Sequence, residues 1–440
     1  MAENDAPKSR KNSEPKAPRR YSEKPKAKRY APPERRRSRR DAEAGEITAP
    51  AGSRGRREYY RKKEVLRKKR ARRRAFVVLF SIIAALVTIA IIAVFVLKGC
   101  SADKQMGEIT ETIAVTQPAT QPPYTPVAEK LPELDDNGAD GYMDGSLYIW
   151  NSMGFDIFKG DEKSALVYSS AIADAKKALG NDITVYNMVV PNHTAYGLPD
   201  RILSNLDTNA QRDNTTVIYS NYGEHVIPID VYNAIGAKRC EYIFYNTDNR
   251  WTSYGAYQAY AEFARTAGIE PIALDGLKKN KIENYGGSYV KSTGNLDLLA
   301  NPDTIEYYEI PGKYKCSVIE RNSDGTISQE AKSAEMYKTE FDEDEDELNV
   351  FICGDNPLFM IDNEDKNDGN RLLVVKDTFG SAIVPFLASN YDEVYVIDFR
   401  YYSGSIKEYC NKKGIKNVLF VNGIMSANSA AQINKLKECF

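Results

Sequence analysis

Two short stretches of the chain hold side chains whose types and spacing could support acyl transfer. In "YNTDNRW", residues 245–251, Asp248 and Arg250 fall within one turn after an apolar run. In "VVKDTFGS", residues 374–381, Thr378 stands where a strand is expected to end and a helix to begin. Such a turn exposes a hydroxyl beside backbone N–H donors, which is the arrangement of a nucleophile with an oxyanion hole. We expect the two stretches to share one site.

The residue types limit the chemistry of that site. Serine-type acyl transfer requires a base that takes the hydroxyl proton and a carboxylate that orients the base. Arginine stays protonated and has no lone pair to accept a proton, so Arg250 cannot be that base. Thr378 keeps a hydroxyl, but its β-branch hinders attack. We expect a degenerate site in which Arg250 forms a salt bridge with Asp248; the alternative for Asp248 is the N-cap of the following helix.

The elements that would position these residues have the pattern of an α/β fold. Continuous apolar runs such as 182–191 and 371–376 alternate with segments of helical spacing such as 161–180 and 252–268. This alternation predicts a mostly parallel sheet flanked by helices. Residues 285–350 break the rhythm with short Tyr- and Val-rich runs, and we expect a β-rich insertion there.

Ligands of open α/β sheets bind at the carboxyl ends of the strands. The run "YIFYNTD", residues 242–248, predicts a strand that ends at Asp248, and 371–376 predicts one that ends just before Thr378. We therefore expect Asp248 and Thr378 to meet at one edge of the sheet. A third predicted strand ends close to His193, which is a candidate replacement base near the cleft, whereas His225 is expected to be an ordinary loop histidine.

Both stretches resemble one known family. "TDNRWTSYGAYQAY" (247–260), "LLVVKDTFGSAIVPFLASNYDEVYVIDFRYY" (372–402) and the "VVP…LP" segment at 189–199 are similar to the DHHW family of Firmicutes. The resemblance covers roughly residues 142–440, and the gapless block at 372–402 is its most specific part. It implies an SGNH-hydrolase-like fold related to the alginate O-acetyltransferase proteins, and an O-acetyl esterase or acetyltransferase activity.

The resemblance also implies roles for single residues. The Asp of the family's Asp-His-His-Trp motif falls on Asp248, and its Trp falls on Trp251. The middle His falls on Asn249 and the catalytic His falls on Arg250. Both histidines are therefore replaced, while the spacing of the motif is kept.

A second motif of the family, Lys-Asp-Ser, supplies the nucleophile. Its Ser falls on Thr378, and its Lys and Asp fall on Lys376 and Asp377. The candidate substrate-binding residues are Trp251, Lys376, Asp377 and His193. Packing is the alternative role for Trp251, and capping of the helix from 379 is the alternative for Asp377.

An uncharged apolar run occupies residues 76–97. As a helix with a rise of about 1.5 Å per residue, it would span a hydrocarbon core of roughly 30 Å, which predicts one transmembrane helix. Residues 1–75 hold 28 Lys and Arg against 10 Asp and Glu, a net charge of +18; since the whole chain carries −1, the rest carries −19. The positive-inside rule then places the N-terminus in the cytoplasm and residues 98–440 outside.

The segments on either side of this helix differ in composition. Residues 1–75 are rich in Pro, Glu, Lys and Arg, which predicts a disordered tail that contacts the cytoplasmic membrane and is no specific nucleic-acid reader. Residues 98–140 are rich in Pro, Thr and acidic residues and predict an extracytoplasmic stalk. The globular domain is expected at 141–440.

The cysteines and histidines give no sign of a metal site. The chain has six Cys and two His, without Cys-x-x-Cys or another metal-ligand spacing, and we expect neither metal nor cofactor. Disulfides are permitted outside the cell, with a connectivity that the sequence leaves open. Cys100 is either reversibly acylated or a free thiol. The acidic run "FDEDEDE" at 341–347 is typical of a solvated loop.

Three functional interpretations follow. The preferred one is a membrane-anchored, extracytoplasmic pseudoenzyme of the cell envelope that binds or positions polysaccharide or an acyl-transfer partner. The second is a live O-acetyl esterase or acetyltransferase with Thr378 as nucleophile and an unconventional base. The third is a non-enzymatic envelope adaptor whose tail contacts cytoplasmic partners.

The charge asymmetry around 76–97 predicts that residues 98–440 lie outside the cytoplasm. Protease added to intact protoplasts should therefore digest the body of the protein. A body that survives in intact protoplasts and is digested only after lysis would show the opposite topology.

Overall fold

The computed structural model describes residues 124–127, 130–223, 225–322 and 324–440. The predicted tail (1–75), the predicted transmembrane helix (76–97) and residues 98–123 of the predicted stalk lie outside the described residues. Within the described ranges, no helix is both long enough and apolar enough to cross a membrane.

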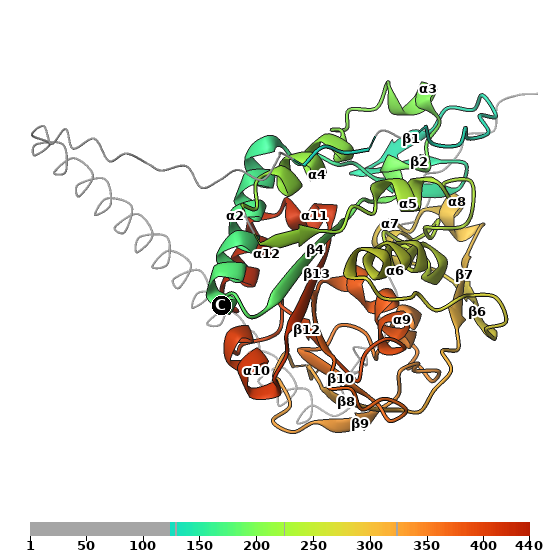
Figure 1. The fold of residues 1–440 in the computed structure, drawn as a ribbon. Helices are drawn as coiled ribbons and strands as arrows, with labels where there is room; N and C mark the ends of the chain where they lie inside the picture. The colour runs from blue at the N-terminus through green and yellow to red at the C-terminus, as the bar shows by residue number, and fades with distance from the viewer. Residues whose placement is uncertain (1–123, 128–129, 224, 323) are drawn as a thin grey trace, which may run out of the picture. The chain divides into compact units, whose positions relative to one another are not determined.

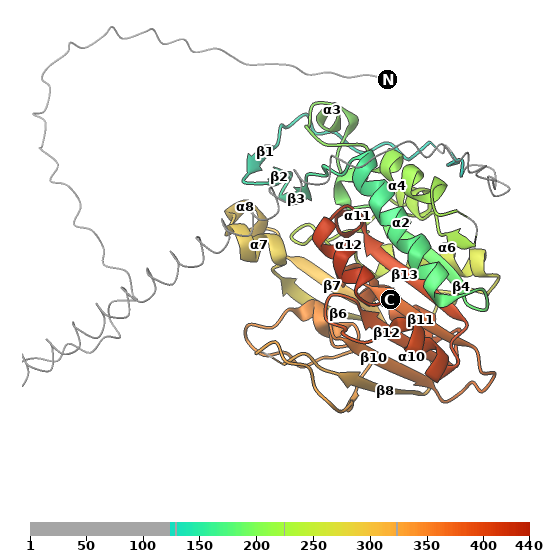
Figure 2. The same cartoon turned by 90° about the vertical axis from the view of Figure 1, so that its left-hand side faces the viewer.

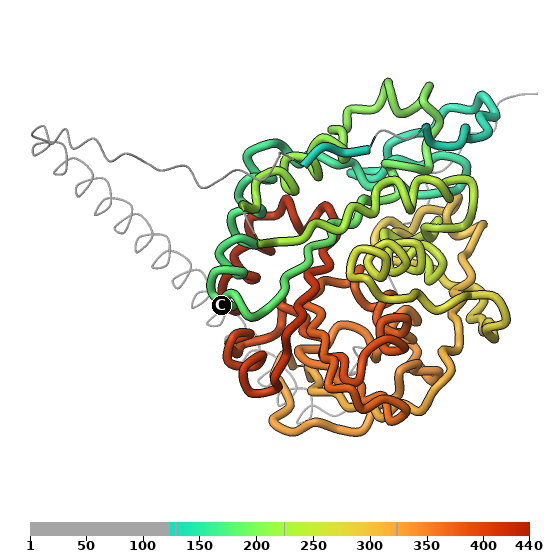
Figure 3. The backbone as a smooth tube through the Cα atoms, in the orientation of Figure 1, coloured from blue at the N-terminus to red at the C-terminus, as the bar shows by residue number. Residues whose placement is uncertain are grey.

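A large sheet forms the centre of the domain (Figure 1). In spatial order its eight strands are β5 (Val226–Pro228), β4 (Thr184–Val190), β13 (Asn417–Gly423), β11 (Arg371–Lys376), β12 (Glu393–Asp398), β10 (Leu358–Asn363), β8 (Tyr314–Ile319) and β9 (Lys332–Ala334). The first five are parallel, and the last three continue the sheet in antiparallel pairing. β4 and β13 lie side by side although more than 200 residues separate them in the chain (Figure 3).

Alternate residues of the central strands enter two separate cores. In β11, Leu372 and Val374 join one hydrophobic cluster, while Leu373 and Val375 join the other. A strand buried on both faces is apolar without a break, because successive side chains point to opposite faces. The predicted α/β fold with a largely parallel sheet is confirmed for this central part.

Helices cover both faces of the sheet (Figure 1). One face, which Figure 2 looks onto, carries α2 (Glu162–Leu179), α4 (Gln211–Ser220), α10 (Ile406–Lys413), α11 (Ile424–Ala427) and α12 (Ala430–Lys437). The other carries α5 (Tyr232–Gly236), α6 (Ser253–Ala267), the 3₁₀ helix η4 (Thr378–Ile383) and α9 (Val384–Ala388). The helix α6 ends where Gly268 adopts a left-handed φ of 70°, as the sequence predicts.

Smaller elements surround this frame. They are the sheet of β1 (Tyr142–Asp144), β2 (Leu147–Trp150) and β3 (Met153–Asp156), the pair β6 (Lys279–Tyr285) and β7 (Asp303–Tyr308), and the short helices η2 (His193–Ala195), α3 (Asp200–Leu203), α7 (Ser288–Thr293), α8 (Leu296–Leu299) and η3 (Glu347–Val350). The segment 285–350 is thus less β-rich than predicted, because it also holds three short helices. Its strands β8 and β9 are no separate insertion but extend the main sheet.

Part of the predicted stalk lies against the body. The ring of Tyr124 contacts that of Tyr219 edge-on, with centroids 5.3 Å apart, and its hydroxyl donates to Asp230. Arg201 pairs with Asp136 at 2.8 Å. The described residues 124–140 therefore contribute contacts to the domain.

The strand predicted for 242–248 does not form; Phe244 and Trp251 make only an isolated bridge. The backbone N–H groups of Asn246 and Thr247 donate instead to the carboxylate of Asp303, at 2.9 and 2.7 Å. A side-chain carboxylate thus satisfies the donors that a neighbouring strand would otherwise take. This loop carries Asp248 to the site.

Candidate active site

Asp248 and Arg250 form a buried ion pair. Arg250 Nε lies 2.6 Å from Asp248 Oδ1, and Nη2 lies 2.8 Å from Oδ2. The backbone N–H groups of Arg250 and Ser288 donate to the same carboxylate at 3.0 and 2.8 Å. The Asp248 side chain is fully buried, and that of Arg250 is 12% exposed. This is the salt bridge that the sequence predicts, and it engages both carboxylate oxygens.

The charges and hydrogen bonds around Asp248 and Arg250 together have a larger effect on their pKa values than their burial does. Burial alone would raise the pKa of Asp248, but Arg250 and backbone donors hold that pKa well below its usual range. Burial alone would lower the pKa of Arg250, but Asp248 raises it well above the usual value. Both groups stay charged: the guanidinium has no lone pair to accept a proton, and the lowered pKa makes Asp248 a weak proton acceptor. The N-cap of α6 is Thr252, whose Oγ1 accepts from Gly255 N–H, so the capping alternative for Asp248 is wrong.

A tyrosine and a second carboxylate complete the surroundings of the guanidinium. Arg250 Nη2 lies 2.8 Å from Asp346 Oδ2 and 2.9 Å from the Tyr285 hydroxyl. That hydroxyl lies 2.9 Å from Asp248 Oδ2. Three segments distant in sequence therefore converge on one cation. Asp346 belongs to the acidic run at 341–347, which is not merely the solvated loop that its composition predicts.

Trp251 joins the two candidate stretches. Its indole N–H donates to the backbone carbonyl of Phe379 at 2.9 Å, and the two rings meet edge-on with centroids 5.9 Å apart. The side chain is 1% exposed, so neither ring face is open to stack on a sugar. The structure favours the packing role of Trp251 over substrate binding.

Thr378 opens the helix η4 directly after β11, at the strand-to-helix turn that the sequence predicts. Asp377 caps this turn from below: its carboxylate accepts from the backbone N–H groups of Phe379 at 2.9 Å and Gly423 at 2.8 Å. Burial raises the pKa of Asp377. The Asp377 side chain is buried, so the structure supports its alternative role as a cap.

The Thr378 hydroxyl lies between two charged groups that the sequence analysis does not single out. Its Oγ1 is 2.9 Å from Arg400 Nη1 and 3.0 Å from Asp355 Oδ2. Since arginine can only donate, the hydroxyl hydrogen points to Asp355. Burial alone would raise the pKa of Asp355, but Lys376 and Arg400 hold it well below its usual range, which makes this carboxylate a weak proton acceptor.

Arg400, which lies beside Thr378, repeats the geometry of Arg250. Its Nε and Nη2 donate to the two oxygens of Asp398, two residues earlier, at 2.8 and 2.6 Å. Its backbone N–H donates to Asp398 Oδ1 at 3.1 Å. The signal for this pair was present in the sequence: the Asp-x-Arg spacing of 248–250 recurs at 398–400, again after an apolar run.

Lys376 is buried beneath the threonine. Its Nζ lies 2.6 Å from Asp355 Oδ1, 2.9 Å from Ser381 Oγ and 3.4 Å from Asp398 Oδ2. These three contacts use the three hydrogens of an ammonium, so no lone pair faces the hydroxyl of Ser381. Lys376 therefore orders the carboxylates behind the site and does not line it.

A strained turn delivers Asp355. Ile352, Cys353 and Gly354 have φ values of 50°, 56° and 81°, three consecutive left-handed residues. This conformation is an outlier for a β-branched residue and costs on the order of 1–2 kcal/mol per residue. Such strain persists only where the surroundings determine it, and it is common at functional sites.

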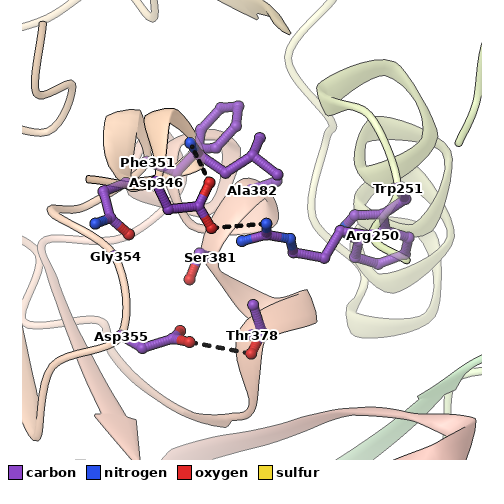
Figure 4. Close-up of a pocket in the computed structure, with 11 residues that line it drawn as sticks. Arg250, Trp251, Asp346, Phe351, Gly354, Asp355, Thr378, Ser381 and Ala382 are labelled. Carbon is purple, nitrogen blue, oxygen red and sulfur yellow. Dashed lines mark hydrogen bonds and ion pairs between the residues drawn. The ribbon is translucent and has the colours of Figure 1, made fainter. Parts of the chain in front are cut away.

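One small cavity joins these groups (Figure 4). It has a volume of about 50 Å³ and is lined by Arg250, Trp251, Asp346, Leu348, Asn349, Phe351, Gly354, Asp355, Thr378, Ser381 and Ala382. The two stretches that the sequence singles out thus meet, with Asp248 behind Arg250. The volume suits a few water molecules or one small chemical group.

His193 does not line this cavity. Its ring lies between Phe155 and Phe244, with centroid distances of 4.6 and 5.2 Å. Its Nδ1 has no hydrogen-bond partner among the described residues, and burial lowers its pKa from 6.5 to about 3. The position gives no support to a role as replacement base.

Comparisons with known proteins agree with the fold. The sequence profile of the DHHW protein family matches residues 135–397. A solved DHHW family protein from Eubacterium siraeum is 27% identical, with a TM-score of 0.60 over 68% of this chain and 97% of that one. PatB1 of Bacillus cereus, solved with a sulfonyl adduct, is 20% identical, with a TM-score of 0.53 over 67% of this chain and 98% of that one. The O-acetyltransferase domain of Pseudomonas putida AlgJ aligns at 14% identity and a TM-score of 0.34, over 64% of this chain and 94% of that one. No curated protein matches the chain.

Replacing Arg250 with glutamine is expected to destabilise the domain by about 3–5 kcal/mol, because Asp248 would remain buried without a cation. Arg201→Gln is the matched control: Arg201 also pairs with two carboxylates, but at 41% exposure, and its loss should cost much less stability because water screens an exposed ion pair. Urea unfolding of the three proteins measures both changes. Equal losses for the two variants would show that the buried pair is not special.

His193 should make the stability of the domain depend on pH. Its pKa is about 3 in the folded protein against 6.5 without burial. Between these values only the unfolded chain binds the extra proton. The stability is therefore complete above pH 6.5 and falls towards pH 3, by about 1.4 kcal/mol per pH unit.

The variant His193→Phe should remove that part of the slope, since it keeps an aromatic ring between Phe155 and Phe244 but has no group that titrates. His225→Asn is the control for loss of the other histidine. Urea midpoints at pH 4.5 and 7 measure the difference. An unchanged slope in His193→Phe would rule out the buried neutral imidazole.

Proposed function

The chain belongs to the DHHW family, and from that premise we propose that residues 141–440 bind cell-envelope polysaccharide without turning it over. The segment 76–97 anchors this domain to the cytoplasmic membrane, and the domain lies on the outer side. The proposal assigns the protein to the envelope as a non-catalytic binding partner of a glycan or of an acyl-transfer protein.

One observation supports the proposal that the domain does not turn over its ligand. Arg250 occupies the position that the family resemblance gives to the catalytic histidine, and it is fixed there by Asp248, Asp346 and Tyr285. A permanently charged guanidinium cannot take the proton of a nucleophile. Removing the base of a catalytic triad costs on the order of 10⁴–10⁶ in rate, which leaves no useful reaction.

The remaining site is suited to binding. Trp251 and the Asp-x-Arg turns hold the walls of the cavity in place, and side-chain oxygens and hydroxyls of Asp346, Asp355 and Ser381 line it. Sugars are recognised through hydroxyl groups that pair with such polar side chains. A rigid wall with fixed polar groups favours recognition of one small group of a larger ligand.

One contact favours a second candidate, a live esterase or acetyltransferase. The Thr378 hydroxyl lies 3.0 Å from Asp355 Oδ2, within reach for a proton transfer. In that reaction Asp355 would take the hydroxyl proton while Thr378 Oγ1 attacks the acyl carbon; the bond from that carbon to the ester oxygen then breaks, the leaving alcohol takes the proton, and water or a second alcohol releases the acyl group from Thr378. The low pKa of Asp355 makes it a poor base, which is why we place this function second.

Restoring the two family residues should restore part of the chemistry. Arg250→His with Thr378→Ser is expected to raise the hydrolysis of an aryl acetate by about 10-fold or more over wild type. Either single change should do much less, because nucleophile and base act as a unit. The gain remains partial because Arg400 and Asp355 still hold the hydroxyl at 378.

Wild type and Thr378→Ala are the controls for this experiment. Substantial turnover by wild type that Thr378→Ala abolishes, together with labelling of Thr378 by a fluorophosphonate, would establish the live enzyme and refute the binding function. A folded double variant that stays as inactive as wild type would mean that the site has lost more than its base and its serine.

A further inference from the structure

We infer that the group which enters the cavity is a protonated primary amine, so that the glycan is one with free amino groups, such as a de-N-acetylated amino sugar. This inference rests on the proposed glycan-binding function and specifies its ligand. It follows from the charges of the cavity, from the acceptors that face it and from its size.

The charges around the cavity are not balanced. Four carboxylates, Asp248, Asp346, Asp355 and Asp398, stand against three cations, Arg250, Lys376 and Arg400. Each of the cations is already bound to two carboxylates. An added anion would meet an excess of negative charge in a partly buried place, whereas an added cation would neutralise it.

The groups with the most open surface are the carboxylates. The side chains of Asp346 and Asp355 are 34% and 25% exposed, against 19% for Arg400, 12% for Arg250 and 1% for Lys376. Carboxylate oxygens accept hydrogen bonds and donate none. A ligand group that donates is therefore favoured over one that accepts.

A third acceptor stands between these two carboxylates in sequence. Asn349 donates through its Nδ2 to Glu345 at 3.1 Å, which turns its carbonyl oxygen away from that contact. The absence of a side chain at Gly354 leaves that oxygen room, because a Cβ there would lie only 2.1 Å from it. Asp346, Asn349 and Asp355 all line the cavity, and their side-chain oxygens are acceptors that can pair with the hydrogens of an ammonium.

Size and context select an amine among cations. A cavity of about 50 Å³ admits an ammonium and its adjoining carbon, but is small for a guanidinium with its stem. Among the described residues, no group of His, Cys, Asp and Glu has the arrangement of a metal site. Ser381, which accepts from Lys376 and lines the cavity, keeps its own hydrogen for a sugar oxygen beside the amine.

The acidic run next to the cavity would draw such a ligand in. Asp342, Glu343 and Asp344 are exposed and form no ion pair with any described residue, while Asp346 of the same run reaches the cavity. Unpaired charges of one sign beside a cleft raise the local concentration of the opposite charge, and salt weakens the effect.

The test compares two oligosaccharides on the full chain, purified in a neutral detergent. A glucosamine pentasaccharide at a pH where its amines are protonated is titrated by calorimetry against an N-acetylglucosamine pentasaccharide of the same linkage. We expect the aminated sugar to bind about tenfold tighter or more, since it gains charge-assisted hydrogen bonds in a partly buried site. Asp346→Asn should remove most of that preference. Asp207→Asn, the same change at a 99% exposed carboxylate, should leave it intact.

Each other outcome overturns the inference in a distinguishable way. Equal affinity for both sugars would refute the amine and leave glycan binding standing. Binding of neither would refute the inference and remove the support for glycan binding as well. If Asp207→Asn weakens the preference for the aminated sugar as much as Asp346→Asn does, the preference comes from general attraction to a negative surface and not from the cavity. If a short lysine peptide binds much more tightly than the aminated sugar and displaces it, the natural ligand is a protein and not a glycan. The affinities of the wild-type protein for the two sugars test the amine inference even if Asp346→Asn does not fold.

Discussion

Two arginines near the cavity each fold back onto the carboxylate two residues before them: Arg250 lines the cavity, and Arg400 contacts Thr378 and Asp355 of its lining. Arg250 grips Asp248, and Arg400 grips Asp398, each through Nε, Nη2 and the backbone N–H. Both aspartates have fully buried side chains, and a buried carboxylate is tolerable only with a bound cation and satisfied oxygens. The positions of the two arginines are therefore fixed by the need to neutralise these charges.

The same requirement explains why the site is ordered but poor in acid–base chemistry. The spare donors of the arginines reach Asp346 and Asp355, so the walls of the cavity are tied to the two turns. The carboxylates raise the pKa values of Arg250 and Arg400, and these cations with Lys376 hold the pKa values of Asp248 and Asp355 well below the usual range. Under the proposed non-catalytic function, a network of this kind would keep the geometry of a reaction site without its proton acceptor.

Local patterns account for the parts of the structure that the sequence predicts. The buried strand 371–376, the helix that ends at Gly268 and the Asp248–Arg250 pair all depend on neighbours in the chain. The failed strand at 242–248 depends on Asp303, more than fifty residues later, whose carboxylate takes two of its amides. Asp355 was not foreseen because no local pattern distinguishes it from other loop aspartates; only the approach of distant segments makes it part of the site. The segments 1–75 and 76–97 stay predictions.

The left-handed turn at 352–354 links the folding stability of the domain to the shape of its cavity. A glycine or asparagine at 353 would relieve part of its strain, because these residues tolerate positive φ, but it would remove a side chain that packs against the hydrophobic core. A turn that retains isoleucine and cysteine in this conformation sacrifices folding stability for the placement of one carboxylate. Stability and placement are thus opposed at this point, and engineering the turn for higher thermal stability would act directly on the shape of the cavity wall. The turn is the place to separate the two: a relaxed variant that melts higher but no longer binds the ligand would show that the strained turn is kept for the shape of a recognition surface.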